Sequence, residues 1–215
     1  MRLAELSERS GVSAATIKYY LREGLLPPGR RITATQAEYD EEHLRRLRLV
    51  RALIQVGRVP VSSAKEVLTA LRDEELGWSE RLGTAVWSLP HGPAPDDADP
   101  VTASARRTAD ELLEHLGWSH RGGDGVAPVA PPYEMLVTAI TTLARLGYPC
   151  SAADLEPYAR GMERLAVDDL DLVERYAPEE QVEAAVALTV LYEPVLLGLR
   201  RLAQGEEARR RFAGQ

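Results

Sequence analysis

The sequence predicts an all-α protein that also contains one small β-hairpin. Three observations support this fold class. Apolar residues recur at helical spacing in most of the chain, a glycine-containing turn joins two short amphipathic segments near the amino terminus, and residues 30–39 favour extended structure. The same patterns divide the chain into a first domain at residues 1–72, a connecting helix and linker at residues 73–100, and a helical domain at residues 101–215.

A helix-turn-helix is predicted at residues 3–22. The motif requires a small residue where its helices cross, a glycine in the turn, and apolar residues one and two turns into the second helix. The residues that meet these requirements at the expected offsets are Leu6, Ser7, Gly11, Val12, Ile17 and Tyr20. Six agreements at fixed offsets make this signal specific.

The second of these helices has one apolar and one polar face. The apolar arc consists of Ala14, Ile17, Tyr20 and Leu21, whereas Lys18, Tyr19 and Arg22 point away from it, with Thr16 at its edge. Ser13 suits the N-cap, and Gly24 can adopt the left-handed conformation that ends a helix. The polar face offers cations to phosphates and polar tips to the base edges of DNA. A solvated amphipathic helix would show the same two faces.

Residues 30–39 are predicted to form a wing, meaning a β-hairpin beside the second helix. Ile32, Thr33 and Thr35 favour extended structure, and Arg30 and Arg31 would contact the phosphates that flank a binding site. A solvated loop is the alternative. Asp40 then caps a third helix, with Arg45, Arg46, Arg48 and Arg51 lying off an apolar stripe of Leu44, Leu47, Val50 and Leu53. A turn at residues 57–61 leads to a fourth helix at residues 61–71. The predicted domain is therefore a winged helix-turn-helix.

Charge is divided unevenly along the chain. Residues 1–72 hold 13 Lys and Arg against 8 Asp and Glu, a net charge of +5, whereas the remainder holds 13 basic and 25 acidic residues, a net charge of −12. A basic end on an acidic body is expected of a protein that meets a polyanion with one domain only.

Three segments of this basic third resemble the DNA-binding domain of the MerR family. They are Leu6-Ser-Glu-Arg-Ser-Gly-Val-Ser-Ala-Ala-Thr-Ile-Lys-Tyr-Tyr20, Gly24-Leu-Leu-Pro-Pro28 and Tyr39-Asp-Glu-Glu-His-Leu-Arg-Arg-Leu47. The resemblance covers residues 1–71. It implies a dimeric winged helix-turn-helix regulator that sits on the spacer between two promoter elements and changes its twist, so that RNA polymerase can or cannot engage both elements.

In this family the recognition helix and the wing contact DNA, and Thr16, Lys18, Tyr19 and Tyr20 match the recognition-helix positions. Together with the residues singled out above, the expected DNA contacts are Ser13, Thr16, Lys18, Tyr19, Tyr20, Arg22, Arg30, Arg31 and Tyr39. One departure concerns the wing, where Thr35-Gln36-Ala37 replaces the usual Gly-Tyr-Arg before Tyr39. A phosphate-binding arginine is therefore missing, and Arg30 and Arg31 are its expected substitutes. The turn at residues 57–61 is also longer than usual.

The chain differs most from the family after residue 71. A typical member continues into a long dimerising coiled coil, whereas here a modest helix at residues 79–89 leads into the linker at residues 91–100. Helices are then predicted at residues 101–116, 133–146, 151–166 and 168–176, with a Gly/Pro loop at residues 121–132. Pro178 opens the longest helix.

This last helix is apolar on every side from Ala184 to Leu199, so its own domain or a second subunit must cover it. Pro194 is expected to kink it. The apolar run contains Glu193 and is too short to span a bilayer, so no membrane is expected, and a symmetric homodimer is the expected assembly. Glu193 is either a buried carboxylate that recognises a cationic ligand or a paired or hydrated group.

An effector pocket in the helical domain would be lined by Trp87, Trp118, Tyr148, Tyr192 and Glu193, although aromatic residues in a helical body more often form core. Cys150 is the single cysteine, which excludes an intrachain disulfide and a thiolate metal cluster. No phosphate loop, nucleophile elbow or zinc motif is present. We therefore expect no catalytic residue, no metal and no cofactor, and a cytoplasmic chain.

Two functions follow from these patterns. The first is a transcriptional regulator that binds double-stranded promoter DNA as a homodimer, affects RNA polymerase indirectly, and senses a small-molecule effector through its helical domain. The alternative is a protein-interaction adaptor that keeps the helix-turn-helix fold without DNA binding. An enzyme with an accessory DNA-binding domain has no motif in its favour.

Overall fold

The computed structural model describes residues 1–33, 36–73, 75–119 and 130–213. It divides into two compact units, one of residues 1–89 and 173–215 and the other of residues 90–172. This division differs from the predicted one, because the last helix joins the amino-terminal domain. Its Val182, Val186 and Val190 lie in the same core as Leu6 and Ile17. Helical spacing predicts that a face is buried, but it does not say which distant helix covers it.

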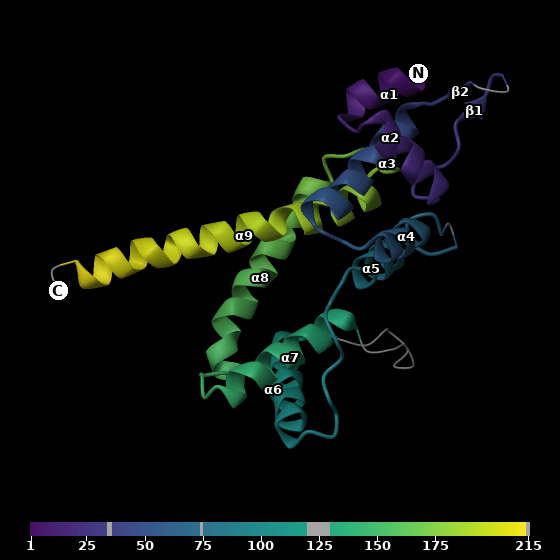
Figure 1. The fold of residues 1–215 in the computed structure, drawn as a ribbon. Helices are drawn as coiled ribbons and strands as arrows, with labels where there is room; N and C mark the ends of the chain where they lie inside the picture. Colours follow the sequence, from purple (N-terminus) through teal and green to yellow (C-terminus); the bar gives the residue numbers. More distant parts are fainter. Residues whose placement is uncertain (34–35, 74, 120–129, 214–215) are drawn as a thin grey trace. The chain divides into compact units, whose positions relative to one another are not determined.

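The amino-terminal elements follow the predicted order (Figure 1): α1 (Leu3–Ser10), α2 (Ala14–Arg22), β1 (Arg30–Arg31), β2 (Ala37–Glu38) and α3 (Glu41–Arg51). Gly11 ends α1 in the left-handed region, with φ 66°. The hydroxyl of Ser13 accepts a hydrogen bond from the backbone N–H of Thr16 at 3.1 Å and so caps α2. Strands β1 and β2 pair antiparallel, with Arg30 opposite Glu38. The predicted helix-turn-helix and wing are confirmed.

Helix α3 supplies the centre of the first unit's core. Asp40 caps it by accepting from the N–H of His43 at 3.2 Å, and the predicted stripe is buried, at Leu44, Leu47, Val50 and Leu53. The helix continues into a π-helical turn, η1 (Ala52–Val56), which the sequence did not predict. Gly57 follows, where a Cβ would lie 2.2 Å from Cγ1 of Val190. The backbone therefore approaches the last helix closely at this residue.

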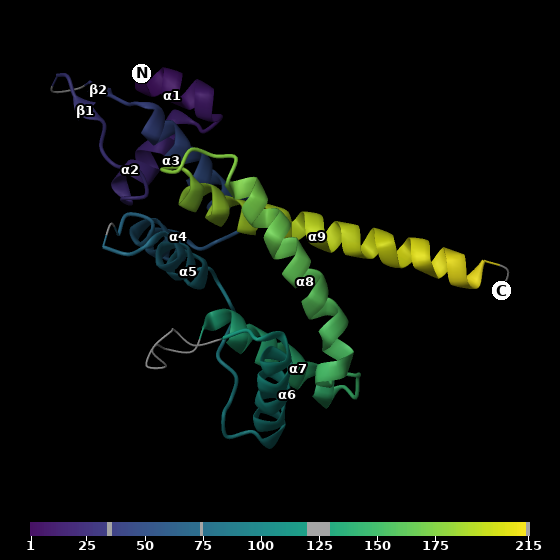
Figure 2. The same cartoon turned by 180° about the vertical axis from the view of Figure 1, so that it is seen from behind.

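Three further helices complete the first unit: α4 (Val61–Ala70), α5 (Trp78–Trp87) and α9 (Gln181–Phe212). The first part of α9 packs against α3, η1 and α5, and the rest extends away from these elements in both views (Figures 1 and 2). Within α9, an 18-residue window has a mean hydropathy of 1.7 and is only 22% buried. By length and composition this 32-residue helix could cross a membrane, so the apolar run is not excluded from a bilayer by length alone.

The second unit contains α6 (Pro100–Leu116), α7 (Pro131–Arg145) and nearly all of α8 (Ala152–Val173). Its core is formed by Ala105, Ala109, Tyr133, Val137 and Ile140. The two helices predicted at residues 151–166 and 168–176 are one helix, because no glycine or proline separates them and Val167 continues the turn. Of the predicted Gly/Pro loop, residues 121–129 lie outside the described residues.

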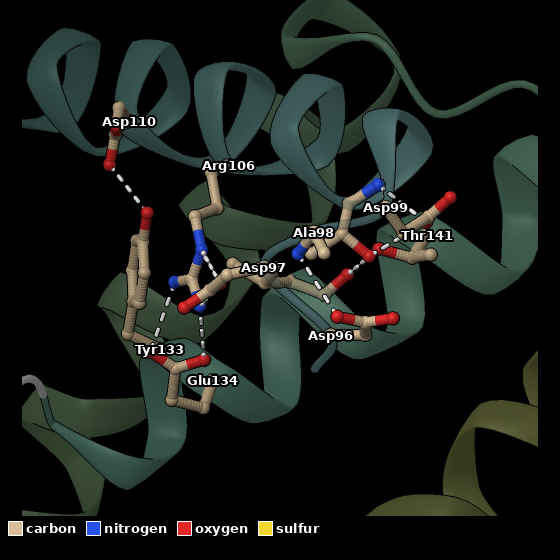
Figure 3. Close-up of polar contacts among 11 residues, drawn as sticks. Asp96, Asp97, Ala98, Asp99, Arg106, Asp110, Tyr133, Glu134 and Thr141 are labelled. Atoms are coloured by element: carbon tan, nitrogen blue, oxygen red, sulfur yellow. Dashed lines mark hydrogen bonds and ion pairs between the residues drawn. The ribbon is translucent and has the colours of Figure 1, made fainter. Parts of the chain in front are cut away.

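A polar network joins the linker to α6 and α7 (Figure 3). The guanidinium of Arg106 donates to Asp97 at 2.6 Å and to Glu134 at 2.9 Å, and the hydroxyl of Tyr133 donates to Asp110 at 2.7 Å. Hydrogen bonding to Glu134 raises the pKa of Arg106, and burial together with Asp110 raises the pKa of Tyr133 to about 12. These groups satisfy one another, so the network holds the unit together and is not a ligand site.

Candidate nucleic-acid interface

The exposed face of α2 carries the polar residues that the sequence predicted. Ile17 and Tyr20 are buried on the inner face, whereas Lys18 is exposed and the side chain of Arg22 is 72% exposed. The guanidinium carbon of Arg22 lies 5.3 Å from the ring centroid of Tyr19, which orients both groups along one side of the helix. Because the apolar face is anchored in the core, this surface is presented in a fixed orientation.

Polar contacts lock both ends of α2 to the rest of the unit. At its start, the hydroxyl of Ser7 donates to the carbonyl of Val12 at 2.6 Å, which closes the turn between α1 and α2. At its end, Lys65 of α4 donates to Glu23 at 3.2 Å. The same carboxylate lies 3.9 Å from Arg22. The recognition surface is therefore held at both ends.

The wing lies beside α2, and hollows separate them. One hollow of about 500 Å³ is bordered by Lys18, Gln36 and the amino-terminal Arg2. Another of about 320 Å³ is bordered by Leu21, Gln36 and Arg31. The structure thus brings the recognition helix and the wing to one surface. Arg2 was not predicted, and the only available signal was a cation directly before the first helix of the motif.

The two wing arginines differ in their surroundings. Arg30 is bound to Glu38 on the opposite strand, and this hydrogen bond lowers the pKa of Glu38. The pair is largely exposed, so the ion pair contributes little to stability. Arg31 is also exposed and borders the smaller hollow. Of the two predicted phosphate contacts, Arg31 is the better placed, because the charge of Arg30 is partly neutralised.

The structure places two of the predicted contact residues in the core. Tyr20 is 3% exposed, and its burial raises the pKa of its phenol. Tyr39 is 7% exposed and packs edge-on against His43, with ring centroids 5.2 Å apart. These tyrosines support the surface from behind, because the hydrophobic face of α2 and the base of the wing need large apolar groups there. Tyr20 borders neither hollow, whereas Tyr39 borders both of them.

The residues expected to line an effector pocket fall in both units. Trp87, Tyr192 and Glu193 belong to the first unit, whereas Trp118 and Tyr148 belong to the second and are 39% and 61% exposed. Glu193 is exposed, so it is a hydrated carboxylate and not a buried one.

A cavity of about 730 Å³ in the first unit has a basic lining formed by His43, Arg45, Arg46, Arg72 and Arg81, with acidic side chains that include Glu183. Arg46 is 4% exposed and donates to Glu183 at 3.3 Å and to the carbonyl of Leu68 at 3.0 Å. Burial and the nearby charge of Arg72 lower its pKa to about 10. The Nε atoms of Arg46 and Arg81 and the Nε2 atom of His43 are buried without a hydrogen-bond partner. The sequence predicted only that Arg46 lies off the apolar stripe.

Comparison with known proteins identifies relatives of both the amino-terminal domain and the whole chain. Residues 1–71 match the MerR HTH family regulatory protein. The HTH-type transcriptional regulator HmrR of Sinorhizobium medicae is 31% identical over 125 residues, which cover 58% of this chain and 79% of that protein. A protein described as a transcriptional regulator, SCO5550 of Streptomyces coelicolor A3(2), is 55% identical. Its crystal structure matches with a TM-score of 0.82 over 100% of this chain and 99% of the other.

Another relative matches over a shorter stretch, so that the chain spans well under half of that relative's length. The HTH-type transcriptional regulator ZntR homolog of Haemophilus influenzae is 38% identical over 50 residues, which cover 23% of this chain and 37% of that protein. The similarity to SCO5550 therefore covers the whole chain, whereas the similarity to the ZntR homolog covers less than a quarter of it.

Proposed function

Because this chain belongs to the MerR family of transcription regulators, we propose that it binds promoter DNA in the cytoplasm as a homodimer, through α2 and the wing. The observation that carries this proposal is the exposed cationic face of α2. Lys18 and Arg22 lie on that face, and Arg31 extends the positive charge onto the wing beside it.

In the proposed complex, Lys18, Arg22 and Arg31 neutralise phosphates, and Thr16 and Tyr19 approach base edges. Two copies place their recognition helices about one helical turn, or 34–36 Å, apart on a palindromic site. Twisting the promoter spacer takes on the order of 1–6 kcal/mol, which the phosphate contacts must supply. RNA polymerase is then affected through the shape of the DNA.

The test compares two arginines of equal exposure. The side chains of Arg22 and Arg209 are 72% and 73% exposed, but Arg209 lies near the end of α9. Lys18→Ala and Arg22→Ala are expected to weaken binding to a duplex from the chain's own promoter, and each to reduce the salt slope by about one. Arg209→Ala is expected to leave both quantities unchanged. Equal effects of Arg22→Ala and Arg209→Ala would remove α2 from the interface.

The adaptor alternative is separated from this proposal by competition. A regulator retains its complex with promoter DNA in a gel shift when unrelated duplex is added in excess, because base contacts add to the phosphate contacts. An adaptor would form no complex at low salt. The altered wing is the feature that favours the adaptor, since it lacks the arginine usual in the family.

The second part of the proposal is that the chain responds to an anionic small molecule in the arginine-lined cavity. The guanidinium groups of Arg72 and Arg81 line the cavity, and a carboxylate would accept charge-assisted hydrogen bonds from them. The cavity is bordered by α3 of the DNA-binding domain and by Val182 and Glu183 of α9. A ligand there would contact both the DNA-binding domain and the last helix.

This part is tested by calorimetric titration with succinate, and with neutral succinamide as the matched probe. We expect succinate to bind and succinamide not to bind. Arg81→Gln is expected to weaken succinate binding about tenfold or more, since hydrogen bonds to charged groups contribute about 1.5–3 kcal/mol. Equal binding of both probes would contradict an anion site.

A further inference from the structure

We propose that the hollow between α2, the wing and the segment before α1 receives the sugar-phosphate backbone of the promoter duplex, and that Arg2 neutralises a phosphate there. This hollow has a volume of about 500 Å³, and Arg2, Lys18 and Gln36 lie around it. The inference rests on the proposed DNA binding by α2 and the wing. It deepens that proposal by adding a contact residue that belongs to neither element.

Among the described residues, two cations and no acidic side chain border this hollow. Arg2 lies before α1, and Lys18 belongs to α2. The other residues of the lining are Leu3, Ala4, Gln36, Ala37 and Tyr39. The wing cations Arg30 and Arg31 are therefore not part of it. Since like charges around one hollow repel each other, the arrangement favours an anion between them.

Backbone hydrogen bonds place Arg2 beside the wing. The N–H of Tyr39 donates to the carbonyl of Met1 at 2.8 Å, so the chain before α1 runs along the end of β2. Both views show the start of α1 next to β2 (Figures 1 and 2). The carbonyl of Arg2 accepts from the N–H of Leu6 at 2.9 Å, which joins Arg2 to the first turn of α1. The backbone of Arg2 is thus fixed between the wing and the helix-turn-helix.

The charge of Arg2 is available to a ligand. Arg2 is exposed, and within the described part of the chain it forms no ion pair. The carboxylate of Glu38 is bound to Arg30, and this hydrogen bond lowers the pKa of Glu38 more than the charge of Arg2 does. Because Glu38 is already paired with Arg30, the guanidinium of Arg2 can bind a phosphate.

The surroundings of the hollow favour a DNA strand over a small free anion. Its lining includes Lys18 of the recognition helix and Ala37 of the wing, the two elements proposed to contact DNA. Exposed cations bind a polyanion more strongly than a single ion, because the polyanion releases condensed counterions when its phosphates are neutralised. A free phosphate ion gains nothing from that release.

The first test compares Arg2→Ala with Arg209→Ala, which removes the same charge near the end of α9. Arg2→Ala is expected to weaken binding to a promoter duplex about three- to tenfold, and to reduce the salt slope by about one. The loss should be equal for an unrelated duplex, since a phosphate contact carries no sequence information. Arg209→Ala is expected to change neither quantity. Circular dichroism checks that each variant is folded.

The second test moves the cation to another wall of the hollow. Ala37 borders the hollow from β2, so Arg2→Ala/Ala37→Arg again places a guanidinium beside it. This double variant is expected to recover the affinity and the salt slope of the natural chain. Arg2→Ala/Ala208→Arg restores the same net charge on α9 and is expected to recover neither. Equal behaviour of the two double variants would mean that Arg2 acts outside the hollow.

The outcomes separate this inference from the proposed function. If Lys18→Ala and Arg22→Ala weaken promoter binding and Arg2→Ala does not, the inference is wrong and the proposed function stands. If none of the three weakens it, both fall. If Arg2→Ala weakens binding to the promoter but not to the unrelated duplex, Arg2 contacts a base and the phosphate contact is overturned.

A calorimetric titration with inorganic phosphate tests the remaining alternative. No saturable binding to the DNA-free chain is expected at millimolar phosphate, because the two cations are exposed. If phosphate does bind, and Arg2→Ala abolishes that binding without changing promoter affinity, the hollow holds a small anion and the inference is overturned.

Discussion

Helices α2 and α9 both bury one face in the same core, but they expose opposite chemistry. The outer face of α2 shows Lys18 and Arg22 to water, whereas the outer face of α9 shows Val195, Leu199 and Leu202. Exposed cations are well solvated and mark a surface for a polyanion. A row of exposed leucines is poorly solvated and marks a surface for an apolar partner. One unit thus presents two exposed surfaces of different chemistry.

The largest expected effect tests whether the two interfaces act together. We expect the exposed apolar face of α9 to join the two copies of the homodimer. Val195→Glu, which puts a carboxylate on that face, is therefore expected to weaken binding to a palindromic promoter site between about 10² and 10⁴-fold, because the second recognition helix is no longer tethered to the first. Binding is measured by fluorescence anisotropy at fixed salt, with Leu197→Glu as the control, because Leu197 is as exposed as Val195 but lies on the opposite side of α9. If a monomeric variant binds with natural affinity, each copy reads DNA alone and the two helices are independent.

The next effect separates the two faces of α2. Ile17 is fully buried, so Ile17→Ala is expected to lower the free energy of unfolding by about 2–5 kcal/mol. Lys18→Ala, one residue further, is expected to change it by about 0.5 kcal/mol or less while weakening promoter binding. Urea unfolding followed by circular dichroism measures the first quantity. A large loss of stability in Lys18→Ala would mean that its side chain supports the fold and not only the interface.

A smaller effect concerns how α9 is seated on the DNA-binding domain. In Gly57→Ala the new methyl group would collide with Val190 and lie 3.0 Å from the carbonyl oxygen of Leu53, so a loss of about 1–3 kcal/mol in the free energy of unfolding is expected. Gly83, inside α5, has no atom within 4 Å of such a methyl group. Gly83→Ala is therefore expected to stabilise the protein by about 0.5–1 kcal/mol. The two substitutions should shift the urea midpoint in opposite directions.

The smallest effect distinguishes stability from recognition at the start of α2. Ser13→Ala removes the cap on the N–H of Thr16 and is expected to lower the free energy of unfolding by about 1 kcal/mol. Ser13→Asp keeps a capping oxygen, so stability is expected to be retained. Promoter binding should nevertheless weaken, since the new carboxylate faces phosphates. Natural affinity in Ser13→Asp would place the DNA away from this end of the helix.

The sequence predicted the features that depend on neighbouring residues. The caps at Ser13 and Asp40, the turn at Gly11, the left-handed Gly24, and the apolar stripe of α3 are each determined within one or two turns of chain. The exposed residues of the candidate interface follow from the same patterns, because a helical wheel places Lys18 and Arg22 on the polar face of α2.

Features that depend on distant contacts were not predictable. The apolar run at residues 184–199 indicated that some partner covers α9, but not that Val186 and Val190 dock on η1 and Gly57. The burial of Arg46 likewise depends on Glu183, which lies 137 residues further along the chain. Tyr39 is buried as well, although the family match assigns it to the DNA contacts. Tyr20 is also assigned there by the family match, whereas the helical wheel already placed it on the apolar arc. The match to a family motif does not distinguish supporting residues from contacting ones.

The second unit is an insertion, because the chain leaves the first unit after Leu89 and re-enters it at Val173. An inserted unit is joined to the first unit at both of its ends. A change in the distance between Pro90 and Leu172 would therefore act on α5 and α9 together. These two helices pack against each other. A single proteolytic cut within residues 91–97 would release one tether, and α9 would then be held on the DNA-binding domain by packing alone, like a bound peptide.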